Sequence, residues 1–209
     1  MPDSTAIAIY LSAAFMLAIT PGPGILYVLT RSLRGGRREG YSSAFGTAIG
    51  GLFHVIAAAA GLSTILATSA LAFSIVKYAG AAYLIYLGIR TIFQPDEITE
   101  TIPIEATANG RKAFYQGIVT EVLNPKTALF FLAFIPQFIN PDGVIFTQFV
   151  ILGGISVFMN TSADIVVATL AGPIGSHLKK HAALRRGQRM FTGTTLIALG
   201  AYVALAKEK

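Results

Sequence analysis

The sequence predicts an all-α integral membrane protein with about six transmembrane helices. Hydrophobic residues make up 54% of the 209 residues and charged residues only 12%, whereas charged residues normally reach about 25% in soluble domains. Mean hydropathy is +0.64, and the charged residues fall in clusters between long apolar runs. A chain of this composition needs lipid to cover it, which argues against a soluble protein with a buried helical core.

Each apolar run is long enough to cross a bilayer core that is about 30 Å thick. The first run is not a signal peptide, because residues 1–5 contain Asp3 and no Lys or Arg. The uncharged stretch 40–76 is too long for one helix, and Thr68 and Ser69 divide it into two. The predicted spans are 5–30, 41–67, 70–93, 113–139, 144–172 and 190–206, all within a single membrane domain, 1–209.

The basic residues predict how the chain is oriented. Twelve of the 16 Lys and Arg residues lie on one side of the predicted membrane. They are Arg31, Arg34, Arg37, Arg38, Arg90, Arg111, Lys112, Lys179, Lys180, Arg185, Arg186 and Arg189. The turns near Ser69 and Pro141 on the other side contain none. The positive-inside rule therefore places the linker 94–112 in the cytoplasm and both termini outside, in a bacterial-type inner membrane.

The same rule explains the basic run 31–38 as a topology signal that contacts lipid headgroups. Binding of nucleic acid is not needed to account for the net charge of +6. The lipid bilayer is therefore the expected partner of these residues.

Helix-breaking prolines interrupt the first and fourth spans. Pro21, Gly22 and Pro23 lie in the run Thr-Pro-Gly-Pro-Gly, and Pro125 lies in the run Leu-Asn-Pro-Lys. Proline lacks an N–H and frees the carbonyl one turn earlier, so each break must face protein or a water-filled cavity. Because one break opens each set of three spans, we expect a 3+3 inverted repeat with a binding site between the halves. Two unrelated kinks are the alternative, since the halves share no strong sequence identity.

Five ionisable side chains lie well inside the predicted spans, and they predict a polar pathway because each costs at least about 2.5–3.5 kcal/mol inside a membrane on insertion scales. We expect Glu121 and Lys126, on either side of Pro125, to form an ion pair that faces the same cavity as Asp164. The two carboxylates would bind a proton or a substrate amine, and Lys126 would bind a substrate carboxylate. The alternative is a purely structural pair that fixes spans four and five.

Other residues within the spans carry expectations of their own. His54 lies near the middle of the second span, where it would relay a proton or bond to a neighbouring helix. Lys77 is expected to extend to the lipid headgroups, and Asn124 to cap the half-helix after the second break. Gly46 and Gly50 predict close helix packing, either within the chain or between two copies in a homodimer, and the alternative is a hinge for alternating access.

The sequence offers little support for catalysis. It contains no cysteine and no Ser/His or paired-carboxylate pattern of an intramembrane enzyme. We therefore expect no catalytic residue, no cofactor and no resident metal.

Five motifs follow one another along nearly the whole chain. They are Thr20-Pro21-Gly22-Pro23, the Arg-Gly-Gly-Arg-Arg run 34–38, Gly46 to His54, Lys77 to Leu84, and Asn124-Pro125-Lys126. In this order and spacing they resemble the LysE/RhtB superfamily of amino-acid exporters. The resemblance implies export of an amino acid or a related small metabolite, powered by the proton gradient. Related branches of the superfamily export divalent metal cations, which is the alternative substrate class.

Overall fold

The computed structural model describes residues 4–68, 70–93, 109–140, 142–180 and 182–206, and nearly all of them lie in helices. The helices are α1 Ser4–Ile19, α2 Pro23–Thr68, α3 Ala70–Phe93, α4 Gly110–Val122, α5 Pro125–Leu129, the π-helix η1 Phe130–Phe134, the 3₁₀-helix η2 Ile135–Phe138, α6 Ile145–Lys180 and α7 Ala182–Leu205. The described part of the chain has no β-strand. The all-α prediction is confirmed.

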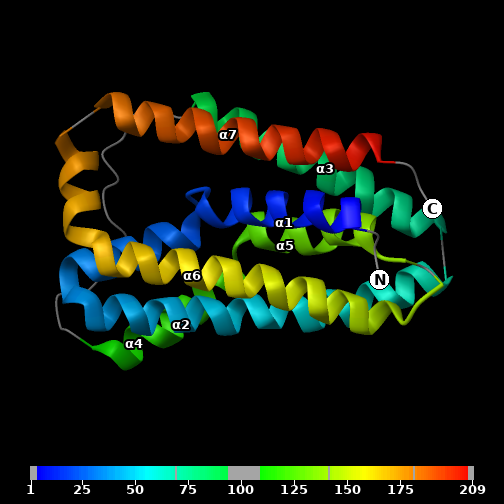
Figure 1. Ribbon diagram of the computed structural model, residues 1–209, viewed down its shortest axis with the longest axis horizontal. Coiled ribbons are helices and arrows are strands. Elements are labelled where there is room, and N and C mark those ends of the chain that lie inside the picture. The colour runs from blue at the N-terminus through cyan, green and yellow to red at the C-terminus, as the bar shows by residue number, and fades with distance from the viewer. Residues whose placement is uncertain (1–3, 69, 94–108, 141, 181, 207–209) are drawn as a thin grey trace.

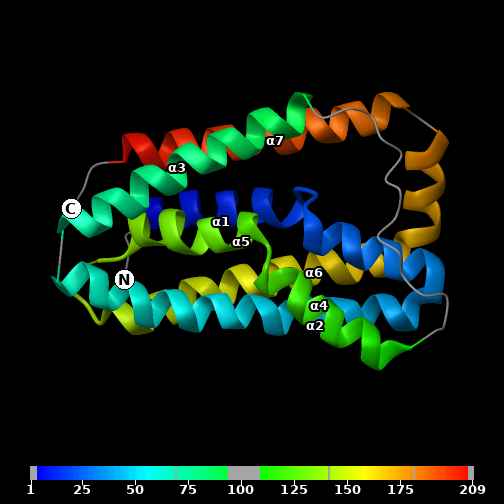
Figure 2. The ribbon, with the colours of Figure 1, turned by 180° about the vertical axis from the view of Figure 1, so that it is seen from behind.

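The helices lie along the long axis of the molecule (Figure 1). α1 begins and α7 ends at one end, where α2 also turns into α3 and η2 leads to α6. The opposite end holds the bend within α2, the end of α3, the start of α4 and the turn from α6 to α7, as the reverse view also shows (Figure 2). We call this the basic end, after Arg34, Arg37, Arg38 and Arg111, which lie there.

Three helical segments in the described residues are long and apolar enough to cross a membrane: Pro23–Gly61, Leu71–Phe93 and Ile145–Gly172. The bent pair Gly110–Val122 and Pro125–Phe138 makes a fourth if it counts as one span. α1 is apolar but has only 16 residues, and α7 begins with basic residues. These helices fit an integral membrane protein, while the six-span 3+3 repeat stays a prediction.

The chain leaves the helical path at both proline motifs. α1 ends at Ile19 and α2 begins at Pro23, so Thr20, Pro21 and Gly22 form the first break. The second break lies between α4 and α5, whose segments meet at a bend of 46°. There the Asn124 side chain accepts a hydrogen bond from the backbone N–H of Lys126 at 3.1 Å, which is the expected N-cap.

The predicted loop between the first and second spans is helical except at Gly36. This glycine has φ 74° and ψ −176°, a backbone conformation that side chains disfavour and glycine tolerates. It divides α2 into two arms, 23–35 and 37–68, at the basic end (Figure 1). Gly35 lies against the carboxylate of Glu39, where a Cβ atom would collide with it. The two glycines therefore let the chain turn and bring Glu39 back toward the first arm.

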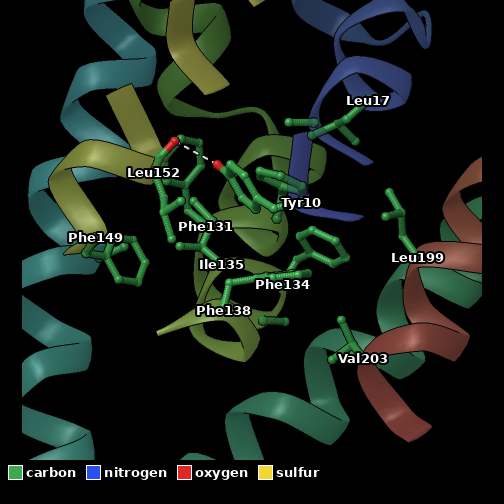
Figure 3. Close-up of a cluster of buried hydrophobic side chains, with 14 of the residues drawn as sticks. Tyr10, Leu17, Phe131, Phe134, Ile135, Phe138, Phe149, Leu152, Leu199 and Val203 are labelled. Carbon is green, nitrogen blue, oxygen red and sulfur yellow. Dashed lines mark hydrogen bonds between the residues drawn. The ribbon is translucent and has the colours of Figure 1, made fainter. Parts of the chain in front are cut away.

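An aromatic core fills the space between α1, α6, α7 and the segment after α5 (Figure 3). Phe130, Phe134 and Phe138 are buried, and the ring of Tyr10 lies 5.3–6.4 Å from all three ring centroids. The hydroxyl of Tyr10 donates a hydrogen bond of 2.7 Å to the backbone carbonyl of Leu152. This core holds α1 against α6 on the side of the molecule where α1 begins.

The helix after α5 widens into a π-helical turn and then tightens into a 3₁₀ turn. Pro136 has no N–H, and its ring would clash with the carbonyl four residues earlier in a regular α-helix. The changed hydrogen-bond pattern avoids that clash. Widened turns of this kind frequently lie at functional sites, and Phe131 in this turn borders the cavity described below.

Small residues on α2 permit close packing within the chain. α2 packs against α4 and α6, and α3 packs against α7. A Cβ atom at Gly46 would collide with the backbone carbonyl of Phe114, and one at Gly50 would lie 2.8 Å from the carbonyl of Ile118. These glycines thus serve the contact between α2 and α4, while the homodimer stays a prediction.

Two cationic residues that the sequence placed at the membrane surface are buried. Lys77 is 1% exposed, and its ammonium donates a 2.6 Å hydrogen bond to the carbonyl of Ala206 at the end of α7. Arg31 is also 1% exposed and pairs with Glu39. The predictions of headgroup contact for these two residues were wrong, because each side chain finds oxygen partners inside the helix bundle.

Candidate functional site

One small cavity lies beside the two helix breaks. Ala18 and Gly24, which flank the first break, and Asn124 at the second break line it together with side chains of α2, α4 and α6. Four of the predicted pathway residues line it: Glu121, Asn124, Lys126 and Asp164. The volume open to the centre of a water molecule is about 20 Å³, which is room for about one water. The structure therefore brings side chains from three helical elements together at the breaks.

Lys126 compensates for the proline at the first break. Its Nζ atom donates to the backbone carbonyls of Leu17 at 3.2 Å and Thr20 at 2.9 Å. In an uninterrupted helix, an N–H at position 21 would bond to Leu17, and Pro21 has none to offer. The expected ion pair between Lys126 and Glu121 is not formed, because the ammonium goes to these freed carbonyls instead.

His54 plays the same part at the second break. An N–H at position 125 would bond to the carbonyl of Glu121, and Pro125 cannot supply it. Nε2 of His54 lies 2.9 Å from that carbonyl oxygen, and since a carbonyl only accepts, Nε2 carries the proton and donates. The hydrogen bond to a neighbouring helix, one of the two expectations for His54, is therefore present.

The carboxylate of Glu121 is buried and has a partner on each oxygen. Oε2 accepts from Nδ2 of Asn124 at 3.0 Å, and Oε1 accepts from the hydroxyl of Thr127 at 2.5 Å. Gly24 makes room for this carboxylate, because a Cβ atom there would collide with Oε2. Gly22 does the same for Lys126, whose Cε would lie 3.1 Å from an added Cβ atom. The glycines of the first break thus admit charged side chains from the second.

Asp164 enters the cavity from α6 and is 6% exposed. Its Oδ2 atom accepts a hydrogen bond of 2.8 Å from the hydroxyl of Thr47 on α2. Its Oδ1 atom has no hydrogen-bond donor within the part of the chain that the structure describes. Sequence reasoning missed Thr47 and Thr127 as partners, because threonines are common in membrane helices and carry no signal of their own.

A second buried cluster lies between this cavity and the basic end. Nη1 of Arg31 pairs with Oε2 of Glu39 at 3.1 Å, and its Nε donates to the Tyr27 hydroxyl at 3.2 Å. Arg31 also donates to the side chain of Gln116 on α4. Oε1 of Glu39 accepts the backbone N–H of Asn109 at 2.6 Å. The cluster joins both arms of α2 to the start of α4.

Comparison with known proteins identifies the family. The family model described as "LysE type translocator" matches residues 15–207. This chain belongs to that family. The match includes both breaks and every residue of the cavity named above. The membership confirms the resemblance seen in the sequence motifs.

Several curated proteins are similar to large parts of the chain, and two of the following three are named as efflux proteins. The homoserine/homoserine lactone efflux protein of Salmonella typhimurium is 32% identical over 198 residues, or 95% of each chain. The leucine efflux protein of Salmonella choleraesuis is 34% identical over 131 residues, 63% of this chain and 62% of that protein. An uncharacterized membrane protein of Bacillus subtilis is 37% identical over 154 residues, 70% of this chain and 73% of that protein. No solved structure matches the chain.

Proposed function

We propose that this LysE-family protein exports an amino acid or a related small metabolite across the inner membrane in exchange for protons. Family membership and the efflux names of the relatives support export. The observation that carries the proposal is the cavity at the two helix breaks, which one ammonium group and two carboxylates border. Ionisable groups at such depth in a transporter mark substrate or ion pathways.

The cavity offers complementary groups for a zwitterion. Asp164 has a free carboxylate oxygen for the substrate ammonium, since Thr47 occupies only Oδ2. Lys126 donates two of its three N–H bonds to backbone carbonyls, which leaves one for the substrate carboxylate. The opposite charges of Asp164 and Lys126 therefore fix the orientation of a bound amino acid in the cavity.

The same carboxylates provide a means of coupling to protons. When the substrate ammonium leaves Asp164, a buried carboxylate loses its counter-charge, and a proton from outside restores neutrality. Glu121 is the second candidate, although Asn124 and Thr127 already satisfy its two oxygens. Binding of the amino acid from the cytoplasm then displaces the proton, so the two fluxes run in opposite directions.

Transport requires the cavity to enlarge, because it holds about one water molecule in this structure. The Tyr10 core lies toward the end where α1 begins. The Arg31–Glu39 cluster lies toward the basic end. We propose that these two clusters act as gates that open alternately, with the basic end in the cytoplasm and both termini outside. The 3+3 repeat is part of this proposal. α2 packs against α6 and α3 against α7, the pairs that the repeat makes equivalent, although α2 packs against α4 as well.

The test of export measures amino acids inside and outside cells that overexpress the protein and are fed a panel of dipeptides. We expect selective release of one amino acid or a small group, and loss of release in Lys126→Ala. Asp142→Asn is the matched control, because Asp142 is exposed and lies outside the cavity. The control should release as much as the unmodified protein.

Absence of any amino-acid release, with the protein confirmed in the membrane, would refute the proposal and direct the test to divalent metal export. Metal binding by proteins favours grouped oxygen or imidazole ligands. Among the described residues, no three His, Cys, Asp or Glu side chains form such a group. The amino acid is therefore the substrate that we propose first.

A further inference from the structure

One face of α6 forms a wall of the cavity. Val157, Asn160, Thr161 and Asp164 line it, and their spacing of three and four residues places them on the same side of a helix. Phe158 is 72% exposed, which marks a different face of the helix as the outer one. The side chains of the cavity wall thus face the site rather than the lipid.

The polar groups of this wall are not equally occupied. The hydroxyl of Thr161 donates to the carbonyl of Val157 one turn earlier, at 2.8 Å, and Asp164 accepts from Thr47. Asn160 makes no hydrogen bond with any described residue, although an amide has two donors and an acceptor oxygen. Asn160 is half-buried, and the amide favours a polar partner at the cavity because burial without one costs free energy.

The surroundings of Asn160 limit what that partner is. The cavity wall includes the apolar side chains Ile25, Phe131 and Val157, and its other polar groups beside α6 bond to one another or to the backbone. A water molecule fits the cavity, and a substrate that displaces this water must replace its hydrogen bonds or lose affinity. Asn160 therefore favours a ligand with a polar atom at this position.

We propose that Asn160 selects the substrate by hydrogen-bonding its side chain. The inference rests on the proposed function, in which Asp164 and Lys126 hold the ammonium and carboxylate groups. An α-amino acid also carries a side chain at Cα. Asp164 and Lys126 are then occupied by the ammonium and carboxylate groups, and Asn160 is available to bond to that side chain. A side chain with a hydroxyl is then preferred over an aliphatic side chain of the same shape, because the aliphatic one leaves the amide unpaired.

Threonine and valine provide the test, since they have nearly the same shape and differ by a hydroxyl in place of a methyl group. Purified protein in liposomes is assayed for uptake of each labelled amino acid, and the ratio of kcat/KM for threonine over valine is measured. We expect Asn160→Leu to lower this ratio about tenfold, the upper part of the range for one hydrogen bond. Asn160→Ala, which removes the amide without adding bulk, should lower it in the same direction.

Thr161→Val is the matched control on the same face of α6. Its hydroxyl is bonded within the helix, so the ratio should stay within about twofold of the unmodified protein. A threonine-to-valine ratio that is unchanged in both Asn160 variants, with both amino acids still transported, would overturn this inference and leave the proposed function intact. If the unmodified protein in liposomes transports neither these nor any other amino acid, the proposed function itself fails.

Discussion

Removing Glu39 should destabilise the protein strongly, because it would leave the buried guanidinium of Arg31 without its counter-ion. The two side chains are 1% and 4% exposed and lie 3.1 Å apart. Breaking a buried pair by removing one partner typically costs about 3–5 kcal/mol. Glu39→Ala would also leave the backbone N–H of Asn109 without its acceptor, so we expect the upper part of that range.

Two further variants separate the lost pair from other effects. The double variant Arg31→Met/Glu39→Leu removes both charges. It should recover more than half of the stability that Glu39→Ala loses, because no unpaired charge is then buried. Recovery stays incomplete because Gln116 and Asn109 lose their partners in this variant. Arg38→Ala, at an exposed position of the same helix, should change stability by less than about 0.5 kcal/mol.

The assay is thermal unfolding of the purified protein in detergent, with the free energy of unfolding taken from the same transitions. A Glu39→Ala protein that unfolds at the temperature of the unmodified protein would refute the reasoning. So would a double variant less stable than Glu39→Ala, because the buried charge would then not be the cause of the loss.

Two other substitutions test contacts on either side of the cavity. Gly24→Ala places a Cβ atom against the carboxylate of Glu121, so we expect amino-acid release to fall at least about tenfold while membrane insertion is retained. The control is Gly154→Ala, where an added Cβ atom meets nothing within 4 Å. Equal release by both variants would contradict the expectation. Tyr10→Phe removes the hydroxyl that bonds to α6 and should cost about 1 kcal/mol of stability, seen as a lower melting temperature than that of Tyr86→Phe at an exposed site.

Much of the site follows from simple chemistry in the sequence. Proline interrupts a helix, so Pro21 and Pro125 predicted the two breaks. Glu121, Lys126 and Asp164 were predicted as the polar groups of the site because they are charged residues within apolar runs. The structure places Glu121, Lys126 and Asp164 around one cavity beside the two breaks. The expected Glu121–Lys126 pair failed because the sequence does not show how far the first break lies from Lys126. Spacing along a chain does not determine which of several acceptors a lysine reaches.

The residues that sequence reasoning placed wrongly owe their positions to tertiary contacts. Arg31 looked like part of a surface cluster, and its burial depends on the turn at Gly36 that brings Glu39 back to it. Lys77 is buried because the end of α7 lies beside α3. Lys77 and Ala206 are far apart in sequence, and Arg31 meets Glu39 only across the turn at Gly36, so periodicity and composition do not report these contacts.

The roles of Asp164 and Lys126 in proton-coupled exchange are the central claim of this account. The most direct measurement follows proton movement with a pH-sensitive dye in liposomes that contain the purified protein, while an exported amino acid is added on one side. We predict substrate-driven proton movement for the unmodified protein and for Asp142→Asn, and its loss in Asp164→Asn and Lys126→Ala proteins that remain folded. Unchanged proton movement in Asp164→Asn or in Lys126→Ala would contradict the account.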